Sequence, residues 1–238
     1  MMREIIKKKF ILENRGPFSN KIIEHMKEVW LSEWVYSSNR LSGSSMSLKE
    51  TLAIIKGEYI LSRTIEDHMV VSRHVDVIHH LEKMAMYKEK MYSDKISYIN
   101  NLFCEGEDYN YRDNNPVKLE CKYIPPHFKE VPHRMKEFNH WYLNESKDLN
   151  PVLKSTLLHH KIMAICPYKE ENEKTARALL NFELIKAGYP AISFDMDETY
   201  YNDLISLYMR TGQYEEFYDK ILKCLNNRLE FFINLTSN

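Results

Sequence analysis

The sequence predicts a mostly helical protein with one short β element. Most of the chain places apolar side chains three or four positions apart, which is the spacing of an amphipathic helix. Only residues 117–124 alternate apolar and polar side chains with a period of two, a pattern typical of a half-exposed strand. The 238 residues are 44% hydrophobic and 28% charged, which suits a globular domain with a sizeable core. We therefore expect an all-α bundle that carries a small β-hairpin.

The helical pattern occurs in segments that are separated by turn-forming residues. These segments are 21–35, 48–63, 65–86, 93–103, 131–144, 150–165, 173–187, 203–210 and 213–233. The Ser-rich stretch 36–47 is predicted to be a turn or a helix junction, and residues 105–116, with one Gly and several Asp and Asn, are predicted to form a loop. Asn172 is the expected N-cap of the helix 173–187, and Gly188 is expected to follow the end of that helix.

The charges of the chain are nearly balanced. Lys and Arg number 33, Asp and Glu number 34, and the net charge is -1. Nucleic acids and anionic membranes recruit an excess of basic residues, so we expect neither as a partner. No apolar run reaches transmembrane length, and the basic N-terminal residues lack the pattern of a signal peptide. A cytoplasmic protein is expected, or one that is exported without a conventional signal peptide.

Four cysteines are spread widely along the chain. They are Cys104, Cys121, Cys166 and Cys224. No two of them form a Cys-x-x-Cys pair, so the sequence predicts neither a zinc site nor a disulfide framework.

A segment in the second half of the chain resembles a family signature. Residues 165–177 read Ile-Cys-Pro-Tyr-Lys-Glu-Glu-Asn-Glu-Lys-Thr-Ala-Arg. They are similar to the Fic/Doc (Fido) signature, His-Pro-Phe-x-Asp/Glu-Gly-Asn-Gly/Lys-Arg-x-x-Arg. Residues 124–132 resemble the stretch after the family's flap, and residues 137–141 resemble the helix that follows it. The matched segments keep the family's order and spacing over most of the chain.

A second resemblance lies near the N-terminus. Residues 38–43 read Ser-Asn-Arg-Leu-Ser-Gly and are similar to the inhibitory motif of the family. The matching positions are Ser38, Ser42 and Gly43. The resemblance thus implies an N-terminal helical extension over residues 1–50 and a Fic core over residues 51–238. It also implies a helical bundle in which a β-hairpin flap covers a signature loop between two helices.

The resemblance implies a specific chemistry. Typical members transfer AMP from ATP to Ser, Thr or Tyr hydroxyls of target proteins. Their signature His is the general base, the acidic residue holds magnesium, and the loop glycines, Asn and two Arg contact the phosphates. In one class, a Glu of the inhibitory motif pairs with the second Arg and prevents productive ATP binding.

The positions of this sequence follow from that pattern. The resemblance assigns the catalytic position to Cys166, the magnesium position to Glu170, and the phosphate contacts to Asn172, Lys174 and Arg177. The flap and target-binding positions are Lys118, Leu119, Glu120, Cys121, Lys122 and Tyr123. A strand there could pair with a partner's strand through backbone hydrogen bonds.

The signature His is replaced by Cys166. A neutral imidazole accepts a hydroxyl proton near pH 7, whereas a thiol with a pKa of about 8.5 is mostly protonated there. Cys166 is therefore a poor substitute for the base. Two alternatives stay open, a buried inert thiol that packs as a small apolar side chain and a covalent nucleophile.

The two glycine positions of the signature are occupied by Glu171 and Glu173. Glycines let a phosphate loop adopt unusual dihedrals and bring its N–H groups close to the anion. With Glu170, the substitutions place three carboxylates where a helix N-terminus would otherwise bind phosphate. We therefore expect a helix start that caps itself.

The basic positions also change. Lys174 keeps the charge of the first signature Arg but not its planar fork. Arg177 remains, and Glu173, one helical turn earlier, is its expected partner. Ser42 stands where inhibitory members carry Glu, so the pairing of that position with Arg177 is expected to be lost. The alternative, release of an active enzyme from inhibition, is disfavoured by the changed loop.

Three hypotheses follow for the function. The first is a pseudoenzyme that binds a protein target or an active Fic-family partner, without a cofactor, as a monomer or a homo-oligomer. The second is an active transferase that moves AMP or another phosphate-containing group, using ATP and magnesium at Glu170, Lys174 and Arg177. The third is a structural protein without a ligand. Nucleotide binding in the presence of magnesium separates the first two.

Overall fold

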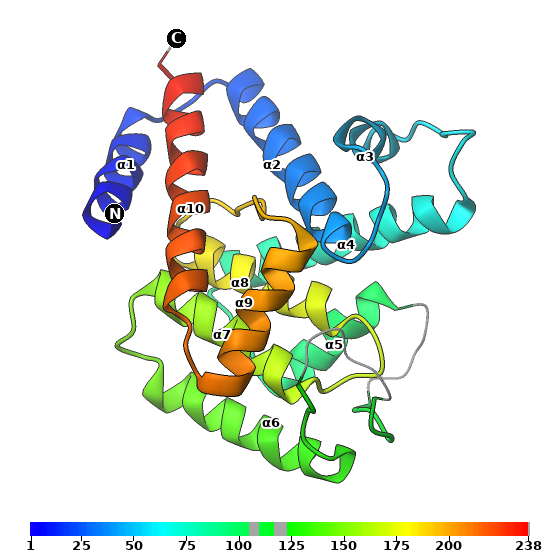
Figure 1. Ribbon diagram of the computed structural model, residues 1–238. Helices are drawn as coiled ribbons and strands as arrows, with labels where there is room; N and C mark the ends of the chain where they lie inside the picture. Colours follow the sequence, from blue (N-terminus) through cyan, green and yellow to red (C-terminus); the bar gives the residue numbers. More distant parts are fainter. Residues whose placement is uncertain (105–109, 117–122, 238) are drawn as a thin grey trace.

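The fold is a bundle of α-helices (Figure 1). The computed structural model describes residues 1–104, 110–116 and 123–237. Its helices are α1 (Met2–Arg15), α2 (Asn20–Arg40), α3 (Leu48–Ile55), α4 (Ile65–Met86), α5 (Ser93–Phe103), α6 (Val131–His140), α7 (Pro151–Ile165), α8 (Asn172–Lys186), α9 (Glu198–Thr211) and α10 (Glu215–Leu235). Two short turns, the 3-10 helix η1 (Phe128–Glu130) and the π-helix η2 (Trp141–Glu145), flank α6. The prediction of an all-α fold is confirmed.

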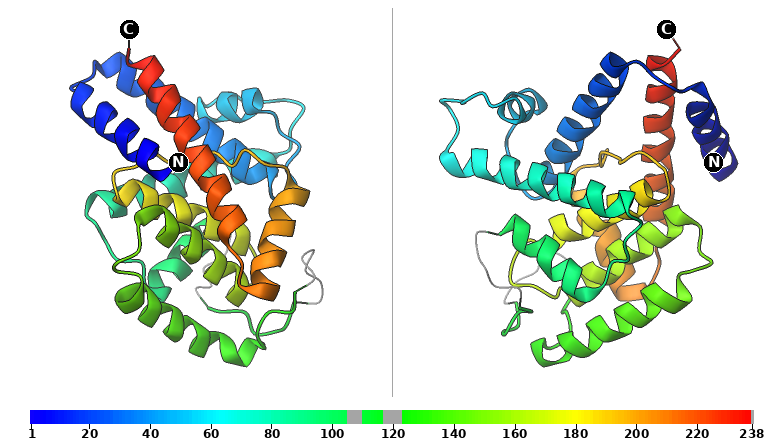
Figure 2. Two further views of the ribbon diagram at one scale, coloured as in Figure 1. Left: turned by 60° about the vertical axis from the view of Figure 1, so that its left-hand side comes forward. Right: turned by 180° about the vertical axis from the view of Figure 1, so that it is seen from behind.

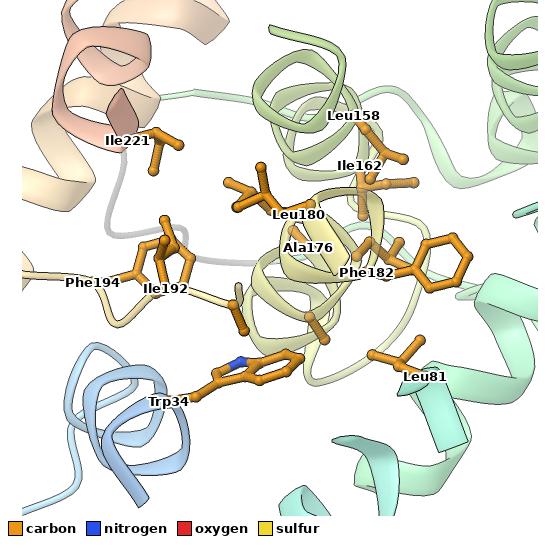
Figure 3. Close-up of a cluster of buried hydrophobic side chains, with 14 of the residues drawn as sticks. Trp34, Leu81, Leu158, Ile162, Ala176, Leu180, Phe182, Ile192, Phe194 and Ile221 are labelled. Carbon is orange, nitrogen blue, oxygen red and sulfur yellow. The ribbon is translucent and has the colours of Figure 1, made fainter. Parts of the chain in front are cut away.

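Helix α8 lies at the centre of the bundle. All of its residues from Lys174 to Leu184 are buried, and it packs against α7, α4, α5 and α2. Figure 3 shows the core around it, in which Trp34 of α2, Ile162 of α7 and Leu180 of α8 are fully buried. Because α8 is packed on all sides by other helices, the position of its N-terminus is fixed by the core. That N-terminus lies within the signature-like segment 165–177.

Local capping explains where several helices begin. The hydroxyl of Ser47 accepts from the backbone N–H of Glu50, whose carboxylate accepts from the backbone N–H of Ser47, and this capping box starts α3. Thr64 and Asp67 form the same arrangement at the start of α4. Gly57, with φ of +84°, follows the end of α3. The predicted helix 48–63 was therefore too long.

The N-terminal part contains more helix than the apolar spacing indicated. Helix α1 was not identified from that spacing, and α2 continues to Arg40, so the expected turn or helix junction 36–47 is confined to residues 41–47. Contacts with distant elements explain the longer helix, because Ser37 accepts from the backbone of Phe194 and Asn39 bonds the ring of buried His74. The turn chemistry of Ser and Asn is overridden by this packing.

Other boundaries agree more closely. The bounds of α4 and α5 match the predicted segments 65–86 and 93–103, and Gly188, with φ of +77°, follows the end of α8 as expected. Helix α9 begins five residues before the predicted segment 203–210. The expected strand 117–124 lies outside the described residues, except that residues 123 and 124 have no regular structure. The domain division at residue 50 stays a prediction.

A cluster of aromatic rings and histidines joins α7, α9 and α10. His160 is fully buried, stacks on Tyr208 with 4.3 Å between ring centroids, and packs on Phe217. Neither ring nitrogen of His160 has a hydrogen-bond partner in the described part of the chain. Burial lowers the pKa of His160 from 6.5 to about 3. The imidazole is therefore neutral in the folded protein at pH 7.

We predict that His160 makes the fold sensitive to acid. Since its pKa is lower in the folded state, its contribution is complete above pH 6.5 and is lost as the pH falls toward 3. Between pH 7 and pH 5, wild type should lose about 2 kcal/mol more of its unfolding free energy than a His160→Phe variant. Urea unfolding at both pH values measures this difference. Equal losses in the two proteins would contradict a neutral, buried His160.

Candidate functional site

The candidate site is the loop between α7 and α8. Cys166 is the C-cap residue that follows α7, and it adopts a left-handed conformation with φ of +47°. Glu171 is the N-cap of α8 and is also left-handed, with φ of +59°. Glu173 lies in the first turn of α8, and α7 and α8 pack against each other, as predicted. The backbone at Glu171 thus keeps a conformation that favours glycine, although a side chain is present.

The loop is held by amide side chains. Asn172 accepts from the backbone N–H of Tyr168 at 2.9 Å and donates to the carbonyl of Tyr168 at 2.8 Å. Asn100 of α5 donates to the carbonyl of Glu170 and to the hydroxyl of Thr175. The prediction that Asn172 caps α8 was wrong, because its side chain closes the loop instead of binding an N–H at the helix start.

Arg112 ties the loop to segments far away in the sequence. Its side chain is buried and donates to the carbonyls of Cys166 and Asn114, at 2.7 and 3.0 Å, and to that of Pro126. Its backbone N–H donates to the carbonyl of Pro167 at 2.9 Å. Burial lowers the pKa of Arg112, but a guanidinium is not deprotonated in proteins, so the side chain keeps its positive charge. It therefore joins both chain segments that flank residues 117–122 to the signature-like loop.

Lys174 is engaged by its own loop. Its ammonium group lies 2.8 Å from the carboxylate of Glu171, and the side chain is 10% exposed. Glu171, at a glycine position of the signature, therefore neutralises Lys174, at the first Arg position. The Glu171 carboxylate accepts a hydrogen bond from Lys174 and makes no side-chain cap bond to the N–H groups of α8.

Arg177 is fully buried and surrounded by acceptors. Its guanidinium donates to the hydroxyl and the carbonyl of Ser38, at 2.9 and 3.0 Å, and to the hydroxyl of Ser42 at 2.5 Å. The predicted contact with Glu173 is present at 3.4 Å. The ring of Tyr201 lies against the guanidinium, with 5.3 Å to its centroid.

These contacts correct one prediction. The pairing between position 42 and Arg177 was expected to be lost, but the Ser42 hydroxyl accepts a hydrogen bond from it. A neutral oxygen can replace a carboxylate here because α2 continues to Arg40 and brings Ser38 and Ser42 to the same guanidinium. The motif therefore still binds Arg177, without a full negative charge.

A cavity of about 860 Å³ runs along the loop. Its described lining includes Ser42, Cys166 and Asn202 of α9, and its charged residues are Arg112, Lys169, Glu170, Glu171, Glu173, Lys174 and Glu198. Four carboxylates thus face three cations. Lys169 pairs with Asp113 at 3.3 Å, so each cation already has a protein partner. Arg177 does not line the cavity.

This arrangement does not fit ATP and magnesium. Space is sufficient, but a polyphosphate would meet an excess of carboxylates, while among the described lining cations Arg112 and Lys174 are held by protein partners and Lys169 is in an exposed pair with Asp113. Such repulsion within a partly desolvated cavity opposes binding strongly. Glu170 is exposed and could still contact a metal ion, yet the described residues contain no cluster of three or more His, Cys, Asp or Glu side chains arranged around one.

The sequence did not reveal Arg112, Asn100 or Tyr201 as parts of the site. Arg112 stands in a loop of turn-forming residues, and Asn100 and Tyr201 lie inside helices. No local pattern distinguishes them from surface residues, because each acts through a contact more than 20 positions away along the chain. The one available signal for Asn100 was its polar side chain at a position on the buried side of α5.

We predict that Arg177 and Ser42 are energetically coupled. Arg177→Met should lower the unfolding free energy by about 3 kcal/mol, because it leaves buried acceptors unsatisfied. Ser42→Ala should cost about 1 kcal/mol, and in the double variant most of that cost should disappear. Ser45→Ala is the control, since Ser45 bonds Arg63. Additive effects of Arg177→Met and Ser42→Ala, measured by denaturant unfolding, would contradict the contact.

Comparison with known proteins places this site in a family. A model of the Fic/DOC family matches residues 90–184. The protein adenylyltransferase Fic of Nematostella vectensis is 25% identical over 221 residues, which are 89% of this chain and 51% of that protein. The Drosophila virilis protein of the same name is 22% identical over 231 residues, covering 92% and 46%. The chain therefore spans about half the length of these curated relatives.

Solved structures show the same fold. A Fic-domain-containing signaling protein from Bacteroides thetaiotaomicron aligns with a TM-score of 0.86 and 20% identity, over 98% of this chain and 97% of that one. Fic-1 from C. elegans aligns with a TM-score of 0.78 and 17% identity, over 98% and 72%. The predicted Fic fold is thereby confirmed. Residues 90–184 thus match the Fic/DOC family, and this Fic domain is related to those of protein adenylyltransferases.

Proposed function

We propose that this Fic domain is a pseudoenzyme that binds a protein instead of transferring AMP. The observation that carries the proposal is the occupation of the phosphate-contacting positions. Arg177 is saturated by Ser38, Ser42 and Glu173, and Lys174 is paired with Glu171. Neither cation is available to a nucleotide unless these contacts break first.

The position of the general base supports the same proposal. Cys166 lines the cavity and is half-buried, so it is accessible enough to meet a ligand. A thiol, however, holds its proton at neutral pH and transfers it poorly compared with an imidazole. Losses of the base and of the phosphate contacts act on different steps, and either one alone would slow AMP transfer strongly.

The proposed partner is a protein target or an active Fic-family protein. Carboxylates of Glu170, Glu173 and Glu198 border a cavity wide enough for a side chain, so a basic segment of a protein would complement it better than a nucleotide. Self-association into a homo-oligomer belongs to the same proposal, as does a cytoplasmic location without a resident cofactor. The flap positions Lys118 to Lys122 lie outside the described residues, so their part in target binding stays a prediction.

One observation favours a second candidate, an active transferase with a different donor. The cavity is lined by Cys166 and Glu170, and Glu171 retains a left-handed backbone of the kind that glycines supply in phosphate loops. A donor with less negative charge than ATP would face less repulsion there. Modification of a protein mixture by wild type, abolished in Cys166→Ala, would support this candidate.

We predict that wild type does not bind ATP with magnesium. Isothermal titration should give no binding heat, because the described carboxylates of the cavity outnumber its cations and Lys174 is paired with Glu171. An active relative such as the Nematostella protein provides the positive control. Saturable binding of ATP to wild type, at the affinity of that control, would contradict the proposal.

Substitutions toward the family signature should restore ATP binding first and AMP transfer second. Cys166→His alone should not give labelling, because the donor is still not bound. Glu171→Gly, Glu173→Gly and Lys174→Arg together, with Ser42→Ala to loosen Arg177, should restore ATP binding first. Adding Cys166→His should then raise AMP transfer by about 10²–10⁴-fold, the usual contribution of a general base. Autoradiography with labelled ATP follows the series, and labelling by Cys166→His alone would show that the loop was never the obstacle.

A further inference from the structure

Helix α1 lies at the edge of the molecule, beside α10 (Figures 1 and 2). Its inner side packs through fully buried Ile5. Lys8 bonds Asn226 and Glu230 of α10, and Arg15 donates to the carbonyl of Ile233 near the end of α10. These contacts fix the rotation of α1 about its axis, so its outer side is defined.

The outer side of α1 is exposed and carries three large apolar side chains. The residues at this side are Arg3, Ile6, Lys7, Phe10, Ile11 and Asn14, and we call the first five the outer stripe. Their spacing of three, four, seven and eight positions places them on one helical face. Phe10 is 64% exposed, Ile6 52% and Ile11 40%. A helix that is apolar on its outer side as well as its inner side indicates a binding surface.

The charges of the outer stripe have one sign. Arg3 and Lys7 are its charged members, and both are basic. The two carboxylates of α1 belong to its flanks, where Glu4 lies 3.7 Å from Lys8 and Glu13 pairs with Lys9. The helix as a whole has five basic and two acidic side chains, although the whole chain has a net charge of -1. The nearly neutral net charge of the whole chain therefore does not reveal that the outer side of α1 is basic and partly apolar.

We propose that the outer stripe of α1 docks on an anionic phospholipid surface. Cations of the stripe would contact lipid phosphates, while Phe10 and Ile6 enter the boundary between headgroups and acyl chains. The shape supports this occupant over a protein, because a single convex helix at the edge of a molecule would need a matching groove on a protein but lies directly on a planar interface. The proposal does not depend on the pseudoenzyme proposal.

The attachment would be peripheral and reversible. No helix in the described part of the chain is long and apolar enough to cross a bilayer. Two cations and three apolar side chains bind a surface modestly, and the attraction weakens as salt screens it. Binding should therefore be detected on anionic vesicles at low salt and should fall as salt is added.

Vesicle flotation tests the proposal. The chain is mixed with phosphatidylcholine vesicles that contain or lack phosphatidylserine, and the bound fraction is measured. Wild type should float with the anionic vesicles only. Phe10→Ser, which leaves the charge unchanged, and Lys7→Gln should each lower the partition coefficient by several-fold, and both together by about tenfold or more.

Matched controls come from another part of the surface. Leu61 is 91% exposed and lies between α3 and α4, and Lys49 is exposed on α3, so Leu61→Ser and Lys49→Gln change the same chemistry elsewhere. These variants should bind vesicles like wild type. Absence of flotation, equal losses in the controls, or a monomer–dimer shift of wild type that Phe10→Ser abolishes would overturn the proposal. The last result would assign the stripe to a second copy of the chain.

Discussion

The contact between Arg177 and the end of α2 is the interaction on which the site depends. A fully buried guanidinium requires acceptors on all sides, and most of them come from Ser38 and Ser42, more than 130 positions earlier. The N-terminal motif is thereby fixed against the central helix α8. The same contact keeps the Arg177 guanidinium in the core and away from the lining of the cavity, so one interaction both stabilises the fold and removes a cation from the cavity.

The loop next to Arg177 contains a left-handed backbone position that is held by its neighbours. Glu171 adopts a left-handed backbone at a cost of about 1–2 kcal/mol for a residue other than glycine. Asn172, Asn100 and Arg112 hold the neighbouring carbonyls and offset that cost, and the Glu171 carboxylate gains the ammonium group of Lys174. The loop thus combines a left-handed backbone position that favours glycine with an internal pairing of its own carboxylate and ammonium group.

Local patterns predicted the parts that local interactions determine. The helices α4 and α5, the loop between two neighbouring helices and the contact of Arg177 with Glu173 follow from periodicity and from short spacings. The end of α2, the bond from Arg177 to Ser42 and the role of Arg112 could not be predicted, since they depend on contacts between distant segments. For the same reason Asn172 was expected to cap a helix, as such residues usually do, whereas the fold uses it to close the loop.

The central claim is that the Arg177 guanidinium is held by the protein and is not offered to a nucleotide. Its Nε–H donates to the hydroxyl of Ser38 inside the core, so its NMR resonance should be resolved and should exchange slowly with solvent. Following that resonance while ATP and magnesium are added tests the claim directly. The account predicts that its chemical shift and exchange rate stay unchanged. A saturable shift of the Arg177 Nε–H resonance that tracks ATP concentration would contradict it.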